Sequence, residues 1–106
     1  MFDMRQLNVR YFEVRLQNGM KLDVEPPKLK VLKTISEMAK IERETITNEG
    51  DVFTRLAEAI SKALSKNKQQ KKITTDFVLD TMNIDEMQGL LKAYFDWVGN
   101  IQYSKN

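Results

Sequence analysis

Three acidic residues that lie close together in the chain, Asp80, Asp85 and Glu86, carry the kind of oxygen atoms that bind a hard cation. Their spacing has neither the alternating oxygen ligands nor the glycine of a calcium-binding loop. We therefore interpret them as solvated or helix-capping residues.

The chain contains no histidine and no cysteine. It thus lacks the commonest transition-metal ligand, the ligands of a thiolate zinc site and the usual general base near neutral pH. A Ser-His-Asp or Cys-His arrangement is excluded. We expect a protein that is not an enzyme, with no catalytic, cofactor-binding or metal-binding residues.

A second group is the polar segment KNKQQKK, residues 66–72, which contains Lys66, Lys68, Lys71 and Lys72. It follows a predicted helix, and cations at that end of a helix interact favourably with the helix dipole. The alternative is a phosphate-binding patch, to which Lys62 would contribute. The segment has no aromatic residue, arginine or glycine-rich loop, and the net charge of the chain is only +2. We favour a solvated helix end over a nucleic-acid contact, and the sequence leaves open whether the segment is ordered.

The third group is the aromatic cluster AYFDWV, with Tyr94, Phe95 and Trp97. Successive residues of a helix turn by about 100°, so three large aromatic residues within four positions cannot all point into a core. A wide core-facing stripe explains most of the cluster, but a ring at its edge is typical of protein interfaces. We predict a partner-binding surface formed by Leu90, Tyr94 and Trp97.

The length of 106 residues indicates a single domain, residues 1–106, with a modest core. Apolar residues make up 42% of the chain and charged residues 30%, as in ordinary globular proteins. The uninterrupted apolar runs are short, so we expect no membrane-spanning segment. Asp3, Arg5 and Arg10 fall where a secretion signal would need its apolar block, and the absence of cysteine fits a reducing compartment.

Residues 11–25 have the alternation of a β-hairpin with one buried face. The apolar positions are Phe12, Val14, Leu16, Met20, Leu22 and Val24. A two-residue turn would pair apolar with charged residues, whereas a three-residue loop pairs Val14 with Leu22 and keeps the faces matched. We predict the three-residue loop, because it places Gly19 where a left-handed residue is needed.

The helical part, residues 27–101, has four segments with helical periodicity, the first of which Pro27 is suited to open. Gly50 separates the first two, and Asp51 is suited to cap the second. The apolar stripe of the first is Leu29, Leu32, Ile35, Met38 and Ala39, and that of the second is Phe53, Leu56, Ile60, Ala63 and Leu64.

A short third segment opens at Thr74 or Thr75, with Phe77 and Val78 pointing inward. Asn83 and Glu86 have the spacing of a capping box at the start of the last helix. Its stripe is Ile84, Met87, Leu91, Tyr94, Val98 and Ile101, and Gly99 is placed to end it. Two strands followed by four helices predict an α+β fold, with an N-terminal β-hairpin packed on a small helical bundle.

Four features in this order resemble the tail assembly chaperones of long-tailed bacteriophages and prophages. They are the hairpin with Asn18-Gly19 at its tip, the PPKLKVL entry into a helix, the lysine-rich middle and the final DEMQGLLKAYFDWV helix. The resemblance covers roughly Tyr11 to Ile101 in the order and spacing of elements. The family has no catalytic motif and no fixed binding residues that carry over to positions of this sequence.

The resemblance implies a protein in the cytoplasm of the bacterial host that binds the tape measure protein and helps to recruit tail tube protein during virion morphogenesis. A tape measure protein is mostly long amphipathic helix, so its partner needs an apolar groove or stripe, and many copies along it would add avidity. Self-association is left open. Two alternatives also stay open: a small basic nucleic-acid-binding regulator that uses Lys62 and the lysines of residues 66–72, and a structural head–tail connector or minor tail protein.

Overall fold

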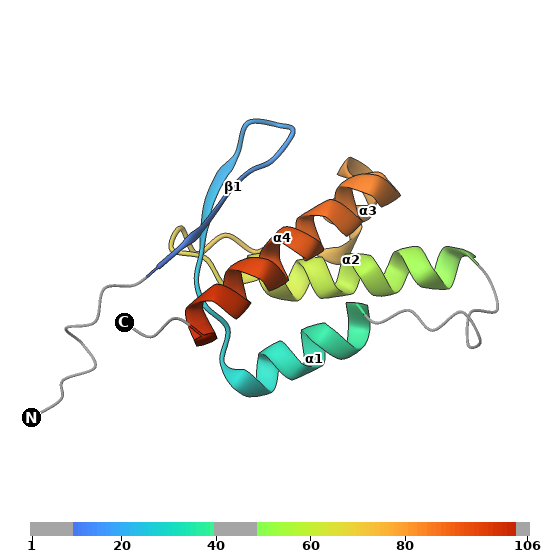
Figure 1. Ribbon diagram of the computed structural model, residues 1–106. Helices are drawn as coiled ribbons and strands as arrows, with labels where there is room; N and C mark the ends of the chain where they lie inside the picture. Colours follow the sequence, from blue (N-terminus) through green and yellow to red (C-terminus); the bar gives the residue numbers. More distant parts are fainter. Residues whose placement is uncertain (1–9, 40–48, 104–106) are drawn as a thin grey trace, which may run out of the picture.

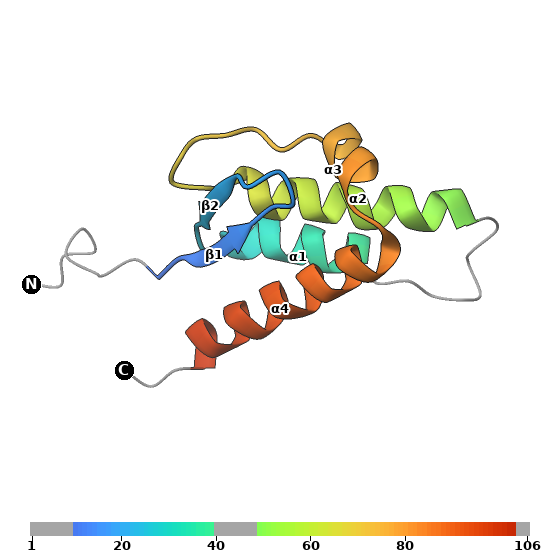
Figure 2. The same ribbon diagram turned by 90° about the horizontal axis from the view of Figure 1, so that it is seen from above.

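A computed structural model describes residues 10–39 and 49–103 of the protein (Figure 1). Two antiparallel strands precede four helices, so the predicted α+β fold with a hairpin packed on helices is confirmed. In Figure 2, β1 lies between β2 and α4, and the connection from α2 to α3 passes on the far side of β2. The elements are β1 (Phe12–Arg15), β2 (Lys21–Val24), α1 (Leu29–Ala39), α2 (Glu49–Ser65), α3 (Thr75–Thr81) and α4 (Ile84–Tyr103).

The hairpin has the predicted register. Val14 pairs with Leu22 across the two strands. The Leu16 N–H donates to the Met20 carbonyl at 2.8 Å, and the Gly19 N–H donates to the Leu16 carbonyl at 2.9 Å, which closes the three-residue loop. Gly19 has a φ of +89°, the conformation that favours glycine. Alternation of apolar and polar side chains and the chemistry of the loop therefore fix the same pairing.

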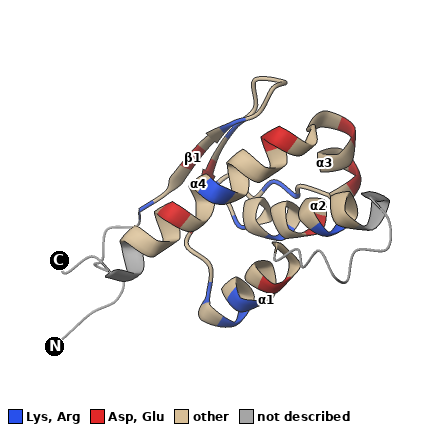
Figure 3. Cartoon of the chain, turned by 45° about the vertical axis from the view of Figure 1, so that its right-hand side comes forward, with Lys and Arg blue, Asp and Glu red and all other residues tan. Residues whose placement is uncertain are grey.

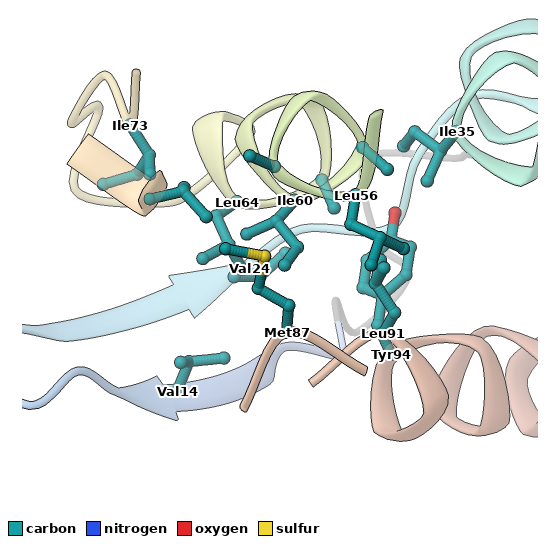
Figure 4. Packing of buried hydrophobic residues seen from close by; sticks show 14 of the residues in the cluster. Val14, Val24, Ile35, Leu56, Ile60, Leu64, Ile73, Met87, Leu91 and Tyr94 are labelled. Carbon is teal, nitrogen blue, oxygen red and sulfur yellow. The ribbon is translucent and has the colours of Figure 1, made fainter. Parts of the chain in front are cut away.

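The core is built around α2, whose Leu56, Ile60 and Leu64 are buried (Figure 4). The helices α1, α3 and α4 and the strand β2 pack against this helix, and β1 pairs with β2. The buried apolar side chains that they add to the core are Val14 of β1, Leu22 and Val24 of β2, Ile35 of α1, Val78 of α3, and Met87, Leu91, Tyr94 and Val98 of α4. Burial of an aliphatic side chain stabilises the fold by about 1.5–3 kcal/mol. The helices and the hairpin are held together by this shared burial.

Two helix starts follow the sequence closely. The Thr74 side chain accepts the Phe77 N–H at 3.1 Å and caps α3. Asn83 and Glu86 form the predicted capping box, in which the Asn83 N–H donates to Glu86 Oε1 at 2.9 Å and the Glu86 N–H donates to Asn83 Oδ1 at 2.8 Å. These contacts satisfy backbone donors that a helix start leaves unpaired.

The first helix differs from the prediction at two positions. It begins at Leu29 and not at Pro27, and the Lys28 carbonyl accepts the Leu32 N–H at 2.9 Å. Leu29, predicted on the buried stripe, is 75% exposed. The buried face of α1 centres on Ile35, and Leu29, six residues earlier, points about 120° away around the helix.

The second helix begins at Glu49, so Gly50 and Asp51 lie inside its first turn and the predicted cap at Asp51 is wrong. Phe53, predicted to be buried, is 37% exposed. The reason is visible in Figure 1, where the first turns of α2 extend past the ends of α1, α3 and α4. Gly99 does not end α4, contrary to the prediction, because the helix continues to Tyr103.

Residues 66–72, predicted as a solvated helix end, form an ordered segment along the outer edge of β2. Asn67 forms a β-bridge with Val24. The Glu25 N–H donates to the Lys66 carbonyl, and the Lys68 N–H donates to the Asp23 carbonyl, both at 2.9 Å. The segment therefore covers the edge of β2 much as a third strand would.

The buried side chain of Asn67, 3% exposed, holds this segment in place. Its Nδ2 donates to the carbonyls of Leu64 and Lys71, each at 2.7 Å, and its Oδ1 accepts the Lys71 N–H at 2.9 Å. Three hydrogen bonds satisfy an amide that would be costly to bury alone. Asn67 thus joins the end of α2 to the segment that lies along β2.

A pair of glycine substitutions tests the hairpin loop. Gly19→Val should lower the free energy of unfolding by about 1–3 kcal/mol, since a β-branched residue resists positive φ although no atom lies within 4 Å of the added Cβ. Gly89→Ala, in the interior of α4 with open space at its Cβ, should raise it by about 0.5–1 kcal/mol. Urea denaturation measures both, and an unchanged stability of Gly19→Val would contradict the left-handed loop residue.

Asn67→Ala tests the segment along β2. It should lower the free energy of unfolding by about 2–3 kcal/mol, because it removes the partners of the Leu64 carbonyl, whose bond is buried, and of the partly buried Lys71 carbonyl and N–H. Gln69→Ala is the matched control. Gln69 is exposed and bonds only to Asp23, so this substitution should lower the free energy of unfolding by less than about 1 kcal/mol. Equal losses in the two variants would show that Asn67 has no special role.

Candidate protein-binding surface

The three residues predicted to contact a partner all lie on α4, but their exposure differs. Tyr94 is 1% exposed and packs inside the core. Leu90 and Trp97 are half-buried at its edge. Only Leu90 and Trp97 therefore present side-chain surface to a partner in this structure.

Trp97 belongs to an aromatic cluster that joins α4 to the start of β1. Its ring stacks on Phe12 with centroids 5.5 Å apart and planes inclined by 27°. Tyr94 contacts Phe12 edge-on at 6.0 Å, and Phe95 contacts Tyr94 edge-on at 5.6 Å. Such pairs add about 0.5–1.5 kcal/mol each beyond the area they bury. Trp97 therefore helps to fasten the hairpin to α4, whatever else it contacts.

The Tyr94 hydroxyl is buried and has no hydrogen-bond partner among the described residues. In Figure 4 it points from α4 toward the region of Leu56 and Ile35. Burial raises the pKa of Tyr94 from 10.0 to about 12, because the phenolate would lose its hydration. A neutral tyrosine in this place is a packing residue with an unsatisfied polar atom.

Leu90 lines a groove of about 440 Å³ between the tip of the hairpin and the α3–α4 corner. We call it the hairpin–helix groove. Leu90, Phe77 and Met82 are half-buried, so the groove has an apolar lining with surface to offer. The full set of lining residues is Val14, Arg15, Leu16, Gln17, Asn18, Phe77, Asp80, Thr81, Met82, Glu86 and Leu90.

Charged side chains stand at the rim of this groove. Arg15 lies on the strand side, and Asp80 and Glu86 lie on the helical side, where Figure 3 shows acidic positions on α3 and at the start of α4. Glu86 is also the capping residue of α4, so its carboxylate is held in place by the Asn83 N–H. An apolar floor with a charged rim resembles the layout of protein interfaces.

The lysines of residues 66–72 are partly engaged within the fold. Lys66 Nζ donates to the Pro26 carbonyl at 2.7 Å. Lys68 Nζ lies 5.7 Å from the centroid of the Tyr11 ring, a cation–π distance. Lys66 is thus engaged by the residue that follows the hairpin and Lys68 by Tyr11 at its start, which weakens the case for a phosphate-binding patch.

The acidic residues Asp80, Asp85 and Glu86 do not gather as ligands. Across residues 10–39 and 49–103, no three acidic side chains lie together in a way that would hold a metal ion. Within the same ranges no helix is both long and apolar enough to cross a membrane. The hairpin–helix groove brings Leu90, one of the three predicted contact residues, together with the half-buried Phe77 and Met82.

Comparisons of the chain with protein-family models, with curated proteins and with solved structures find no match. The function of the protein is therefore inferred from the hairpin–helix groove, from the residues that line it and from the resemblance of the sequence to a known family.

Sequence reasoning missed the hairpin–helix groove as a site, although it singled out Leu90. Phe77 was expected to point inward, whereas part of its surface stays exposed beside the hairpin. Met82, at the end of α3, is likewise half-buried in the groove. One signal in the sequence could have indicated it. The helical segments have more apolar residues than one buried stripe can accommodate, so some apolar side chains had to remain at the surface.

Tyr94→Phe tests the unsatisfied hydroxyl. Removing it should leave the free energy of unfolding near pH 7 unchanged or raise it by about 1–2 kcal/mol, since no hydrogen bond is lost. Denaturation at several pH values adds a second readout. The unfolded tyrosine ionises near 10.0 and the native one near 12, so the native state binds more protons between these values and stability falls as pH rises through that window.

The wild-type protein should lose about 2–3 kcal/mol more than Tyr94→Phe between pH 9 and pH 12, because two pKa units separate the folded and unfolded values. A loss of stability near pH 7 in Tyr94→Phe would reveal a partner for the hydroxyl and contradict this account.

Proposed function

We propose that the protein is a tail assembly chaperone of a long-tailed bacteriophage or prophage, and that it acts without catalysis by binding the tape measure protein in the host cytoplasm. The observation that carries the proposal is the hairpin–helix groove, into which Leu90 projects beside an apolar floor. A chaperone of this kind must cover apolar surface of a partner reversibly. A groove lined by half-buried apolar side chains is suited to that task.

The two walls of the groove are held in place by different contacts. Its helical wall is anchored by the capping box at Asn83 and Glu86 and by the buried Val78 and Met87. Its other wall is the hairpin tip, which extends away from the helices in Figure 1. The groove thus lies between a helical wall held by caps and buried side chains and a hairpin that protrudes from the helices.

Methionine in the lining favours the same use. Met82 lines the groove, and its unbranched, polarizable side chain adjusts to different apolar partners. The tape measure protein that the family resemblance implies is long and amphipathic, so it offers apolar surface to several copies of the chaperone along its length. Binding of several copies would give high avidity from weak individual contacts.

The resemblance to tail assembly chaperones supplies the identity of the partner. It includes the last helix, which contains Leu90 and Trp97, and the hairpin with Asn18-Gly19 at its tip. In the structure these two regions are the walls of one groove. Two of the regions that carry the resemblance, the hairpin tip and the last helix, therefore lie at one surface.

Leu90→Ser tests the groove directly. It should weaken binding to the tape measure protein of the same phage genome by about tenfold, because one apolar anchor of roughly 1.4 kcal/mol or more is lost. Isothermal titration measures the affinity, and the melting temperature measures any loss of fold.

The matched control is Leu79→Ser on α3. Leu79 is 38% exposed and does not line the groove, so binding should stay within about threefold of wild type. Equal affinities of wild type and Leu90→Ser would contradict binding in this groove. Mass spectrometry of purified virions adds a test of the role, since a persistent copy in the particle would identify a connector or minor tail protein instead.

A further inference from the structure

The outer edge of β1 has unpaired backbone groups. Leu16 faces β2, because its N–H donates to the Met20 carbonyl at 2.8 Å. Backbone groups of successive residues in a strand point to opposite edges, so Val14 and Phe12 also face β2, whereas Glu13 and Arg15 face outward. Among the described residues no hydrogen bond reaches the N–H or C=O of Glu13 or Arg15.

The other edge of the sheet is already occupied. The Asp23 N–H donates to Gln69 Oε1 at 2.9 Å, and the Asp23 carbonyl accepts the Lys68 N–H at 2.9 Å. Asn67 completes this contact with its bridge to Val24. The hairpin therefore has one covered edge and, within the described part of the chain, one open edge.

The open edge borders the hairpin–helix groove. The lining of the groove includes the run Val14–Asn18 on one side and Phe77, Met82 and Leu90 on the other. Figure 2 shows β1 on the side of the hairpin that faces α4. The unpaired N–H and C=O groups of β1 thus lie beside the apolar lining of the hairpin–helix groove.

We propose that the groove binds its partner by β-strand addition: an extended segment of the partner pairs with the outer edge of β1 and inserts alternate apolar side chains between the hairpin and the α3–α4 corner. Hydrogen bonds to the backbone of Glu13 and Arg15 give the segment its direction and register. A lysine or arginine of the segment contacts Asp80 at the helical rim. The inference rests on the proposed function, because it specifies how the same groove is used.

An extended segment fits this site better than a helix. A helix satisfies its own backbone groups internally, so it would leave the N–H and C=O groups of Glu13 and Arg15 without partners. A strand supplies those partners and places side chains on alternate sides, with every second one directed at Phe77, Met82 and Leu90. Because a tape measure protein is mostly helical, the occupant would be confined to a non-helical stretch of that protein.

A second copy of this chain fits less well. Its own β1 could supply backbone groups, but its Val14 and Leu16 are buried in its own core. Only Glu13 and Arg15, both exposed, would be left to face the groove. The apolar lining thus requires a segment whose apolar side chains are not already used in folding.

Proline substitutions separate strand addition from other modes of binding. Arg15→Pro removes an outward N–H without touching the hydrogen bonds between β1 and β2, a position where an edge strand tolerates proline. Lys21→Pro is the matched control, because Lys21 pairs with Arg15 in register and its N–H points to the opposite edge. Arg15→Ala accounts for the loss of the guanidinium alone, and melting temperatures confirm that each variant folds.

The probe is a fluorescently labelled synthetic peptide of about ten residues in which valine and lysine alternate, a length typical of one strand. A second peptide of the same sequence carries N-methyl groups on alternate backbone nitrogens. Fluorescence anisotropy with the full chain measures the affinity of each peptide, and the tape measure protein is titrated in parallel.

We expect Arg15→Pro and N-methylation of the peptide each to weaken binding by about tenfold or more, while Lys21→Pro and Arg15→Ala stay within about threefold. Amide hydrogen exchange followed by NMR gives a direct readout. The N–H groups of Glu13 and Arg15 should exchange rapidly in the free protein and roughly tenfold or more slowly in the complex.

Equal binding by Arg15→Pro and Arg15→Ala, or unchanged exchange at Glu13 and Arg15, would overturn strand addition. If Leu90→Ser still weakened binding of the tape measure protein, the proposed function would stand and only the mode of binding would fail. A change confined to self-association, seen by analytical ultracentrifugation of Arg15→Pro, would assign the edge to a second copy and likewise overturn the inference.

Discussion

Asn67 joins three parts of the chain. Its side-chain amide bonds to the end of α2 and to Lys71 within the segment of residues 66–72, and its backbone forms the bridge to Val24 in the second strand of the hairpin. An isolated two-stranded hairpin is at best marginally stable in water. This hairpin gains its stability from a buried face on the helices and from a neighbour along β2. Once β2 is covered, the outer edge of β1 becomes the open side of the sheet within the described part of the chain.

The same arrangement explains where the apolar surface of the molecule lies. The aromatic cluster of Phe12, Tyr94 and Trp97 fastens the beginning of β1 to α4. At the other end of the hairpin, the tip and the α3–α4 corner enclose the hairpin–helix groove. A hairpin fixed at its base and spaced from the helices at its tip is suited to accept another chain. The groove and the strand edge are therefore two consequences of one mode of packing.

The polar groups that the fold buries or engages act in packing and in joining its parts. Burial raises the pKa of Tyr94 from 10.0 to about 12, so its hydroxyl stays neutral near pH 7. The lysines of residues 66–72 contribute structure through the contacts of Lys66 with Pro26 and of Lys68 with Tyr11. The function we propose accordingly uses apolar surface and backbone hydrogen bonds.

The sequence by itself determined the hairpin register, the left-handed loop residue at Gly19 and the starts of α3 and α4, because alternation, loop chemistry and capping act between residues close in the chain. Tertiary structure alone decided the exposure of Leu29 and Phe53 and the bridge between Asn67 and Val24. The apolar stripe already placed Tyr94 on the inner face of α4, and packing showed that it is too deeply buried to contact a partner as well. Exposure of a helix position depends on where the neighbouring elements end. The contact of residues 66–72 with β2 joins residues more than forty positions apart, as the hydrogen bond between Gln69 and Asp23 also shows. Periodicity shows that a helix has an apolar face, but only packing determines how much of that face is covered and where a groove is left.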